Sequence, residues 1–255
     1  MNHTGTIIKL VVIPGLILIL SACSSTKDTT TMTAEEHYEY VMEFYEDEDY
    51  EDAIKEFQTL LLQYPGSVIT DDAQYYLGMS YFNREQFLLA AYEFSKLIRD
   101  IPASPFVPDA QFKLADSYYQ LSPPYQLDQS YTKKAIEEFQ AYIDFFPTSP
   151  SIDEAEKKIK ELNEKLAEKE YRSATIYEKM EYNRAAIRYY TQVVDTYHDT
   201  KYAPMALYRK IMLENQRARY SDVLKDIREF LTRYPEDARA KELTELQETL
   251  LAEGW

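Results

Sequence analysis

Glycine, histidine and cysteine are scarce in this chain of 255 residues, which has 5, 3 and 1 of them. With so few glycines, a glycine-rich phosphate-binding loop is not expected. A single cysteine can form neither an intramolecular disulfide nor a zinc site built from cysteines. Basic residues are also in the minority, since 28 of them face 44 acidic residues and leave a net charge of -16. A surface this acidic repels other polyanions, so nucleic acid is not expected as a partner.

The N-terminal segment, residues 1–22, differs from the rest because it carries no acidic residue and has an apolar run from residue 10 to residue 20. That run is long enough for the core of a signal peptide and too short to span a membrane. It ends in Leu20-Ser21-Ala22-Cys23, which resembles the bacterial lipobox. The resemblance implies cleavage before Cys23, a diacylglycerol on its thiol and an N-acyl chain on its amino group. No other cofactor is expected. The alternative is an ordinary signal peptide followed by an incidental cysteine.

The next segment, residues 23–33, is rich in serine and threonine and is predicted to be a flexible tether between the lipid and the folded part. Ser24 follows the cysteine directly. By analogy with lipoproteins of enteric bacteria, serine at this position directs the protein to the outer membrane.

The body of the chain repeats itself. A three-residue mark, most often an aromatic or apolar residue followed by proline, recurs five times. Its last residue is Pro65, Pro102, Pro147, His198 or Pro235, and the spacings are 37, 45, 51 and 37 residues. A small residue stands twelve positions before each mark and a large apolar residue eight positions before it: Ala53, Ala90, Ala135, Ala186 and Val223, then Phe57, Phe94, Phe139, Tyr190 and Ile227. Residues four apart share one face of a helix, and a proline ends that helix.

The second unit has Leu77-Gly78, Tyr81, Ala90, Phe94 and Pro102 at spacings that resemble the tetratricopeptide repeat (TPR), a helix–turn–helix motif. The resemblance implies an all-α solenoid of five such units, in which Gly78 and Ala90 allow two helices to cross closely. An unrelated helical bundle is the alternative. The fifth unit is the least regular, because Lys210 and Glu214 occupy its usual leucine and tyrosine places.

Two units are longer than 37 residues. The extra residues of the third unit fall in 121–128, which we expect to be a loop between its helices. Those of the fourth fall in 153–170, where an apolar stripe at helical spacing predicts one long helix from about 152 to 180. The predicted division is therefore units one to three in residues 34–152, and the long linking helix with units four and five in residues 153–255.

Catalytic chemistry is not indicated. After cleavage only His37 and His198 remain, in separate units, and neither accompanies a nucleophile or a metal-binding spacing. We therefore expect a protein that is not an enzyme and holds no metal.

The TPR resemblance instead implies a concave peptide groove lined by the first helix of each unit. Its positions in units one to three are Tyr38, Met42, Tyr45, Tyr75, Met79, Phe82, Phe112 and Tyr119, with Asp116 as the ninth. Aromatic rings and methionines suit the apolar side chains of an extended peptide. The alternative is that these residues only pack against neighbouring repeats.

The lipobox, the five units and Tyr50-Glu-Asp-Ala53 together with Ala73-Gln-Tyr-Tyr-Leu-Gly78 resemble the BamD family, lipoproteins of the outer-membrane β-barrel assembly (Bam) machinery. The resemblance implies a lipid anchor on the periplasmic face of the outer membrane. It further implies that the first repeats bind unfolded β-barrel proteins and the last repeats dock onto the periplasmic domains of the BamA-like β-barrel insertase. Other Bam lipoproteins are further candidate partners. Another periplasmic TPR lipoprotein, such as a pilus or secretin pilot or a cell-wall synthesis coordinator, is the alternative function.

Overall fold

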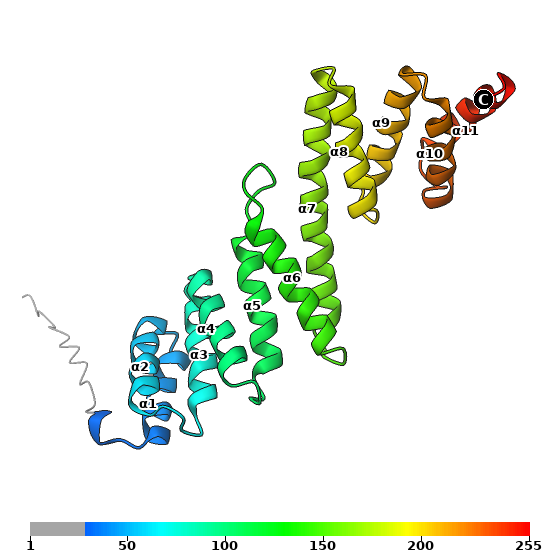
Figure 1. Ribbon diagram of the computed structural model, residues 1–255. Helices are drawn as coiled ribbons and strands as arrows, with labels where there is room; N and C mark the ends of the chain where they lie inside the picture. Colours follow the sequence, from blue (N-terminus) through cyan, green and yellow to red (C-terminus); the bar gives the residue numbers. More distant parts are fainter. Residues whose placement is uncertain (1–28) are drawn as a thin grey trace, which may run out of the picture.

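The computed structural model describes residues 29–255, and in this range it consists of eleven α-helices and one short 3-10 helix, with no strand. Figure 1 shows the helices standing side by side in a row that runs from the blue N-terminal end to the red C-terminal end. Each helix packs mainly against its neighbours in the chain. This is the repeat architecture of a TPR solenoid, so the predicted fold class is confirmed.

Ten of the helices form the five predicted helix–turn–helix units. The pairs are α1 (Ala34–Glu46) with α2 (Tyr50–Gln63), α3 (Thr70–Asn83) with α4 (Phe87–Asp100), α5 (Val107–Leu121) with α6 (Ser130–Phe145), α7 (Ile152–Lys179) with α8 (Asn183–Thr196), and α9 (Tyr202–Gln216) with α10 (Tyr220–Arg233). The residues between α5 and α6 form the loop expected from the longer third unit.

The turn inside four of the five units contains a residue with a left-handed backbone. Glu48, Glu85, Glu181 and Ala218 have φ between 55° and 61°. Glycine is the residue that adopts this conformation without a steric cost, and other residues pay on the order of 1 kcal/mol. The chain therefore keeps the TPR turn despite its shortage of glycine. The third unit replaces the turn with its longer loop.

The second unit shows why one glycine is retained in a helix. A Cβ atom on Gly78 would lie 2.7 Å from Cε1 of Phe94, whose side chain is fully buried. The helices α3 and α4 therefore cross at a distance that only glycine permits at this position. Ala90 is also fully buried, as the small residue predicted on α4.

The long helix predicted from about 152 to 180 is confirmed as α7, which has 28 residues. At 1.5 Å per residue it is about 42 Å long. Ala155 and Leu162 belong to a hydrophobic cluster with the third unit, whereas Ala167 and Ala174 belong to the cluster of the last two units. One helix therefore contributes to two separate cores.

The predicted tether falls only partly within the described residues, and Cys23 and the signal peptide lie outside them. Residues Thr29–Thr31 form the 3-10 helix η1, and Thr33 caps α1 in a reciprocal capping box with Glu36. The hydroxyl of Tyr64 donates a hydrogen bond of 2.6 Å to the carbonyl oxygen of Met32. This end of the segment is therefore attached to the first unit.

One helix was not predicted. α11 (Ala240–Ala252) follows the fifth unit and buries Leu243 and Leu250 against it. These residues, with Leu246 between them, form an apolar stripe at helical spacing, so the signal was present in the sequence. The helix covers the exposed end of the last unit, as terminal elements do in repeat proteins.

The close crossing of α3 and α4 gives a first prediction. Gly78→Ala should destabilise the protein by about 1–2 kcal/mol, because the clash with Phe94 outweighs the better helix propensity of alanine. Chemical denaturation of Gly78→Ala, of Phe94→Leu and of the variant that combines them measures the effect on the free energy of unfolding. In a Phe94→Leu background the same change should become neutral or stabilising, because the clashing ring is gone. An equal loss in both backgrounds would contradict this account of the crossing.

Candidate functional site

All eight predicted groove residues on α1, α3 and α5 are half-buried. They therefore belong neither to the fully buried core nor to the freely exposed surface. Each lies on the first helix of its unit, and several also contact the second helix. Such a row of partly covered aromatic and methionine side chains is accessible to a ligand while its shape is held by the core beneath it.

In the first two units the groove residues meet around Tyr76. Its ring centroid lies 6.5 Å from that of Tyr38, 5.0 Å from that of Tyr45 and 5.4 Å from that of Tyr75. Tyr75 also stacks on Phe106 at 4.8 Å. Tyr76 and Phe106 were not predicted as part of the site. Tyr76 directly follows a predicted groove residue, whereas Phe106 lies in the connection before α5, which the repeat pattern does not cover.

The groove residues of the third unit have other neighbours. Phe112 packs against Phe139 and Tyr142 of α6, with ring centroids 5.5 and 5.3 Å away. The hydroxyl of Tyr119 donates a 2.6 Å hydrogen bond to Glu161 of α7. Among the described residues no ring pair joins these two to the groove residues of units one and two. The structure therefore divides the eight residues into a cluster on units one and two and a separate pair on unit three.

Phe82 lies where the two groups approach each other. Its ring contacts Phe87 at 5.2 Å, and the ammonium of Lys113 on α5 lies 4.6 Å from its centroid. This cation–π contact connects the second unit to the third.

The tyrosine hydroxyls of the groove remain neutral over the physiological pH range. Burial, together with the carboxylate of Asp109, raises the pKa of Tyr75 to about 12. The hydrogen bond to Glu161, followed by burial, raises the pKa of Tyr119 to about 12. Burial also raises the pKa of Tyr38, with Asp72 as the next cause. The hydroxyls of Tyr38 and Tyr75 can therefore donate hydrogen bonds to carbonyl groups of a bound chain, whereas the proton of Tyr119 is already donated to Glu161.

Asp116, at the ninth predicted position, forms an ion pair with the next unit. Its side chain is buried, and Oδ1 lies 2.7 Å from Nζ of Lys158 on α7. Two further lysines of α7 reach the loop after α5: Lys165 bonds to Ser122 and Lys169 to the carbonyl oxygen of Leu127. These contacts fix the third unit and its longer loop to α7. The negative charge of Asp116 is therefore paired with a lysine from another unit.

A polar contact between the two helices recurs in the first three units. Nε2 of His37 lies 3.2 Å from Glu56, and the amides of Gln74 and Gln111 donate to Glu93 and Glu138 at 2.6 and 2.8 Å. Each glutamate immediately precedes the buried phenylalanine of its second helix. This pattern was visible in the sequence and was missed. It places His37 in a contact between α1 and α2.

Within residues 29–255 no group of three histidine, cysteine or acidic side chains is arranged to hold a metal ion. His198 is exposed, and its carbonyl oxygen accepts a hydrogen bond from Tyr234. In the same range no helix is long and apolar enough to cross a membrane.

The model of the YfiO family, described as outer membrane lipoprotein, matches residues 30–222. The chain belongs to the YfiO family of outer membrane lipoproteins. A Rickettsia prowazekii protein named outer membrane protein assembly factor BamD is 29% identical over 215 residues, which cover 81% of this chain and 86% of that protein. The resemblance to the BamD family is thereby confirmed.

Two solved structures are also similar to this YfiO-family chain. A TPR repeats protein from Bacteroides fragilis is 13% identical with a TM-score of 0.47, and the match covers 86% of this chain and all of that one. The TPR2AB domain of yeast Sti1, solved as a complex with pHSP90, is 13% identical with a TM-score of 0.43 over 86% of this chain and 84% of that one.

The family match ends at residue 222, inside the fifth unit, where a buried ionic cluster lies. Nζ of Lys210 on α9 lies 2.7 Å from Oδ2 of Asp226 on α10, and Glu214 beside them is 3% exposed. One oxygen of Glu214 is buried without a hydrogen-bond partner among the described residues. Burial, and then the hydrogen bond and charge of Asp226, raise the pKa of Glu214 to about 7.

This cluster predicts a pH dependence of stability. The pKa of Glu214 is higher in the folded than in the unfolded chain, so its contribution is full below about pH 4.5 and is lost as the pH rises through 7. Glu214→Gln should therefore stabilise the fold by about 1–3 kcal/mol at pH 8 and much less at pH 5. Thermal melts at both pH values measure this, with the exposed Glu248→Gln as the control. A gain of the same size at both pH values would contradict the assignment.

Proposed function

We propose that this chain is a lipid-anchored, non-enzymatic scaffold subunit of the outer-membrane β-barrel protein assembly machinery. Its membership of the YfiO family and its likeness to a protein named an assembly factor support this role. The solenoid adds a physical reason, because a row of stacked helix pairs offers long surfaces to several partners at once. We assign substrate binding to the first units and docking of the BamA-like insertase to the last ones.

The observation that carries the proposal is the half-buried aromatic row of the first units. Tyr38, Tyr45 and Tyr75 meet around Tyr76 and leave their outer edges accessible. An unfolded β-strand presents apolar side chains on one side and an unpaired backbone along its edges. Ring faces can accept the apolar side chains, and neutral hydroxyls can bond to the backbone carbonyl groups. This chemistry favours the interior of a β-barrel segment as the ligand.

The lipid anchor belongs to the same proposal. A diacylglycerol and an N-acyl chain on Cys23 hold the protein firmly, since each buried methylene contributes about 0.8 kcal/mol. The short segment between Cys23 and η1 then keeps the first unit close to the periplasmic face of the outer membrane. The substrate groove would thus lie near the site of insertion.

A different periplasmic TPR lipoprotein, such as a pilus or secretin pilot or a cell-wall synthesis coordinator, is the second candidate function. Affinity purification from detergent-solubilised envelopes separates the two candidates. Recovery of the β-barrel insertase and other Bam lipoproteins would support assembly. Recovery of secretin or cell-wall enzymes without the insertase would replace the proposal.

The anchor gives the third prediction. Cys23→Ser should move the protein from the membrane fraction to the soluble periplasmic fraction, because the serine hydroxyl does not accept the diacylglycerol. Fractionation and mass measurement of the mature chain test it. An unmodified wild-type Cys23 would overturn the lipid assignment, whatever the fractionation shows.

The groove gives the fourth prediction, for which the repeat supplies a matched control. Tyr75→Ala with Met79→Ala should weaken binding of a β-barrel strand peptide by about 2 kcal/mol, roughly thirtyfold. Tyr208 and Met212 stand at the same repeat positions in the fifth unit and are also half-buried. Their double alanine variant should leave peptide affinity unchanged. Binding should also be insensitive to salt, since apolar burial is not screened.

Fluorescence anisotropy with a labelled peptide measures both variants, and thermal melts report their folding. Tyr75→Leu keeps apolar volume against Phe94 and Phe106, so it replaces Tyr75→Ala in the binding measurement if the alanine variant unfolds. Equal loss of affinity in both double variants, or in neither, would show that units one and two are not the substrate site.

A further inference from the structure

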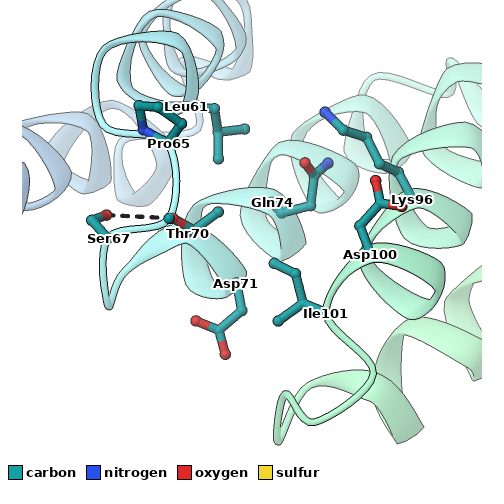
Figure 2. A pocket seen from close by; sticks show the side chains of 10 residues that line it. Leu61, Pro65, Ser67, Thr70, Asp71, Gln74, Lys96, Asp100 and Ile101 are labelled. Atoms are coloured by element: carbon teal, nitrogen blue, oxygen red, sulfur yellow. Dashed lines mark hydrogen bonds between the residues drawn. The ribbon is translucent and has the colours of Figure 1, made fainter.

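The connections between consecutive units lie on one edge of the solenoid, because successive helices alternate in direction. For the first three units these connections join α2 to α3, α4 to α5 and α6 to α7, and Figure 1 shows them along the lower edge of the row. We call residues 62–70, 101–108 and 145–152 together the unit edge. Its first two segments are neighbours, since Pro65 and Ile101 line the same cavity of about 460 Å³ (Figure 2).

The unit edge carries no charge. None of the residues in 57–70, 101–108 and 145–152 is acidic or basic, although charged residues make up 28% of the chain. The edge also holds the three most exposed large hydrophobic side chains within residues 29–255, which are Leu62 at 82%, Val68 at 81% and Phe145 at 74%. Exposed apolar side chains gathered on one uncharged surface mark an interaction site.

The opposite edge of the solenoid, formed by the turns within the units, is charged. Residues 46–49 of the first turn are four consecutive acidic residues, and residues 84–85 of the second turn are an arginine and a glutamate. The connections of the last two units are charged as well, at residues 199–201 and 236–239. The uncharged surface is therefore confined to one edge of the first three units.

The N-terminal segment is attached at this same edge. Tyr64, whose hydroxyl bonds to the carbonyl oxygen of Met32 at 2.6 Å, lies in the connection between α2 and α3. Thr29, at the start of η1, is only three residues before Met32. Cys23 precedes Thr29 by six residues, which span at most about 22 Å when extended. A lipid on Cys23 would therefore hold the unit edge close to the bilayer.

The charges around the attachment point decide which surface can face that bilayer. The neighbouring helix α1 exposes five glutamates, which are Glu35, Glu36, Glu39, Glu43 and Glu46. Moving carboxylates from water into a lipid surface is costly, because the ions lose hydration. Of the two surfaces beside the attachment point, α1 and the unit edge, only the unit edge can contact lipid without burying a charge.

Carboxylates flank each segment of the unit edge and limit the contact. These residues are Asp71, Asp100, Asp109, Asp144 and Asp153. Asp71 accepts a 2.8 Å hydrogen bond from Ser104 and keeps its negative charge. Such a border repels anionic headgroups and favours zwitterionic ones. It also restricts the contact to the side chains that project furthest from the edge.

We propose that the unit edge is a membrane-contact surface, which lies against the zwitterionic headgroup layer of the bilayer that holds Cys23. This inference rests on the proposed lipid anchor. Leu62, Val68 and Phe145 enter the headgroup layer, and the helices of the first three units stand upright on it. A lipid anchor alone leaves the protein free to rotate, whereas this contact fixes its orientation. The aromatic groove, on the sides of these helices, then opens parallel to the membrane.

The proposal can be tested directly because the chain has one cysteine and one tryptophan. Mature chain produced without its natural lipid is coupled through the Cys23 thiol to a maleimide phospholipid in phosphatidylcholine vesicles. The anchor is then present whether or not the cell adds one. In a Trp255→Phe background, a single tryptophan is introduced by Val68→Trp or by Phe145→Trp. Brominated phosphatidylcholine quenches the fluorescence of tryptophans that contact the lipid.

Brominated lipid should quench both introduced tryptophans and leave Leu88→Trp unaffected. Leu88 is the matched control, because it is an exposed apolar residue at the start of α4, on the opposite edge. Leu62→Ser with Val68→Ser should reduce the quenching of Phe145→Trp, since the equilibrium constant for membrane contact falls about tenfold. Their melting temperature should not change. Adding phosphatidylglycerol to the vesicles should also reduce the quenching at low salt.

Absence of quenching at Val68→Trp or Phe145→Trp, or equal quenching at Leu88→Trp, would overturn the proposal. The chemical coupling keeps this result separate from the natural anchor, which the mass of the wild-type mature chain tests. Sedimentation velocity of the uncoupled chain examines another occupant of the edge. A dimer that Leu62→Ser with Val68→Ser dissociates would assign the edge to a second copy of the chain and overturn the membrane contact.

Discussion

Two of the three hydrophobic clusters in residues 29–255 share α7, and the relative placement of the repeat units depends on that helix. Its first half packs through Ala155 and Leu162 against the third unit, and its second half packs through Ala167 and Ala174 in the last two units. Charged contacts reinforce the first half, since Lys158 pairs with buried Asp116 and two other lysines hold the loop after α5. Without this continuous helix the first three units and the last two would be joined by a short connection only.

The surface of the first two units follows from how their cores are built. Small residues at the helix crossings, above all Gly78, bring α3 close to α4 and leave the larger aromatic rings around the edge of each pair. There they are half-covered, which fixes their orientation while leaving one side accessible. The same rings thus contribute both to stability and to a surface for apolar ligands.

Helical periodicity made most of the architecture predictable. The spacing of small and aromatic residues identified the helix pairs, and the apolar stripe between residues 153 and 170 identified α7, because both signals are local in sequence. The contacts that were missed join residues from different helices. Asp116 was predicted to lie at a groove position from the repeat spacing alone, and only the approach of Lys158 from α7 shows that it is paired there. The same holds for Tyr76, Phe106 and the glutamates before each buried phenylalanine, whose contacts also join different helices. The helix α11 was overlooked for another reason, because it has no partner helix to complete a repeat unit.

The continuity of α7 also has a mechanical consequence. The helix contains no glycine or proline, so it has no residue at which it would bend easily. A partner that tilts the fifth unit must therefore tilt the third unit as well, or break contacts in one of the two clusters that the helix serves. For a rigid rod of about 42 Å, a rotation of about 10° at one end displaces the other by roughly 7 Å. The positions of the third unit and of the last two units are therefore linked through this one helix.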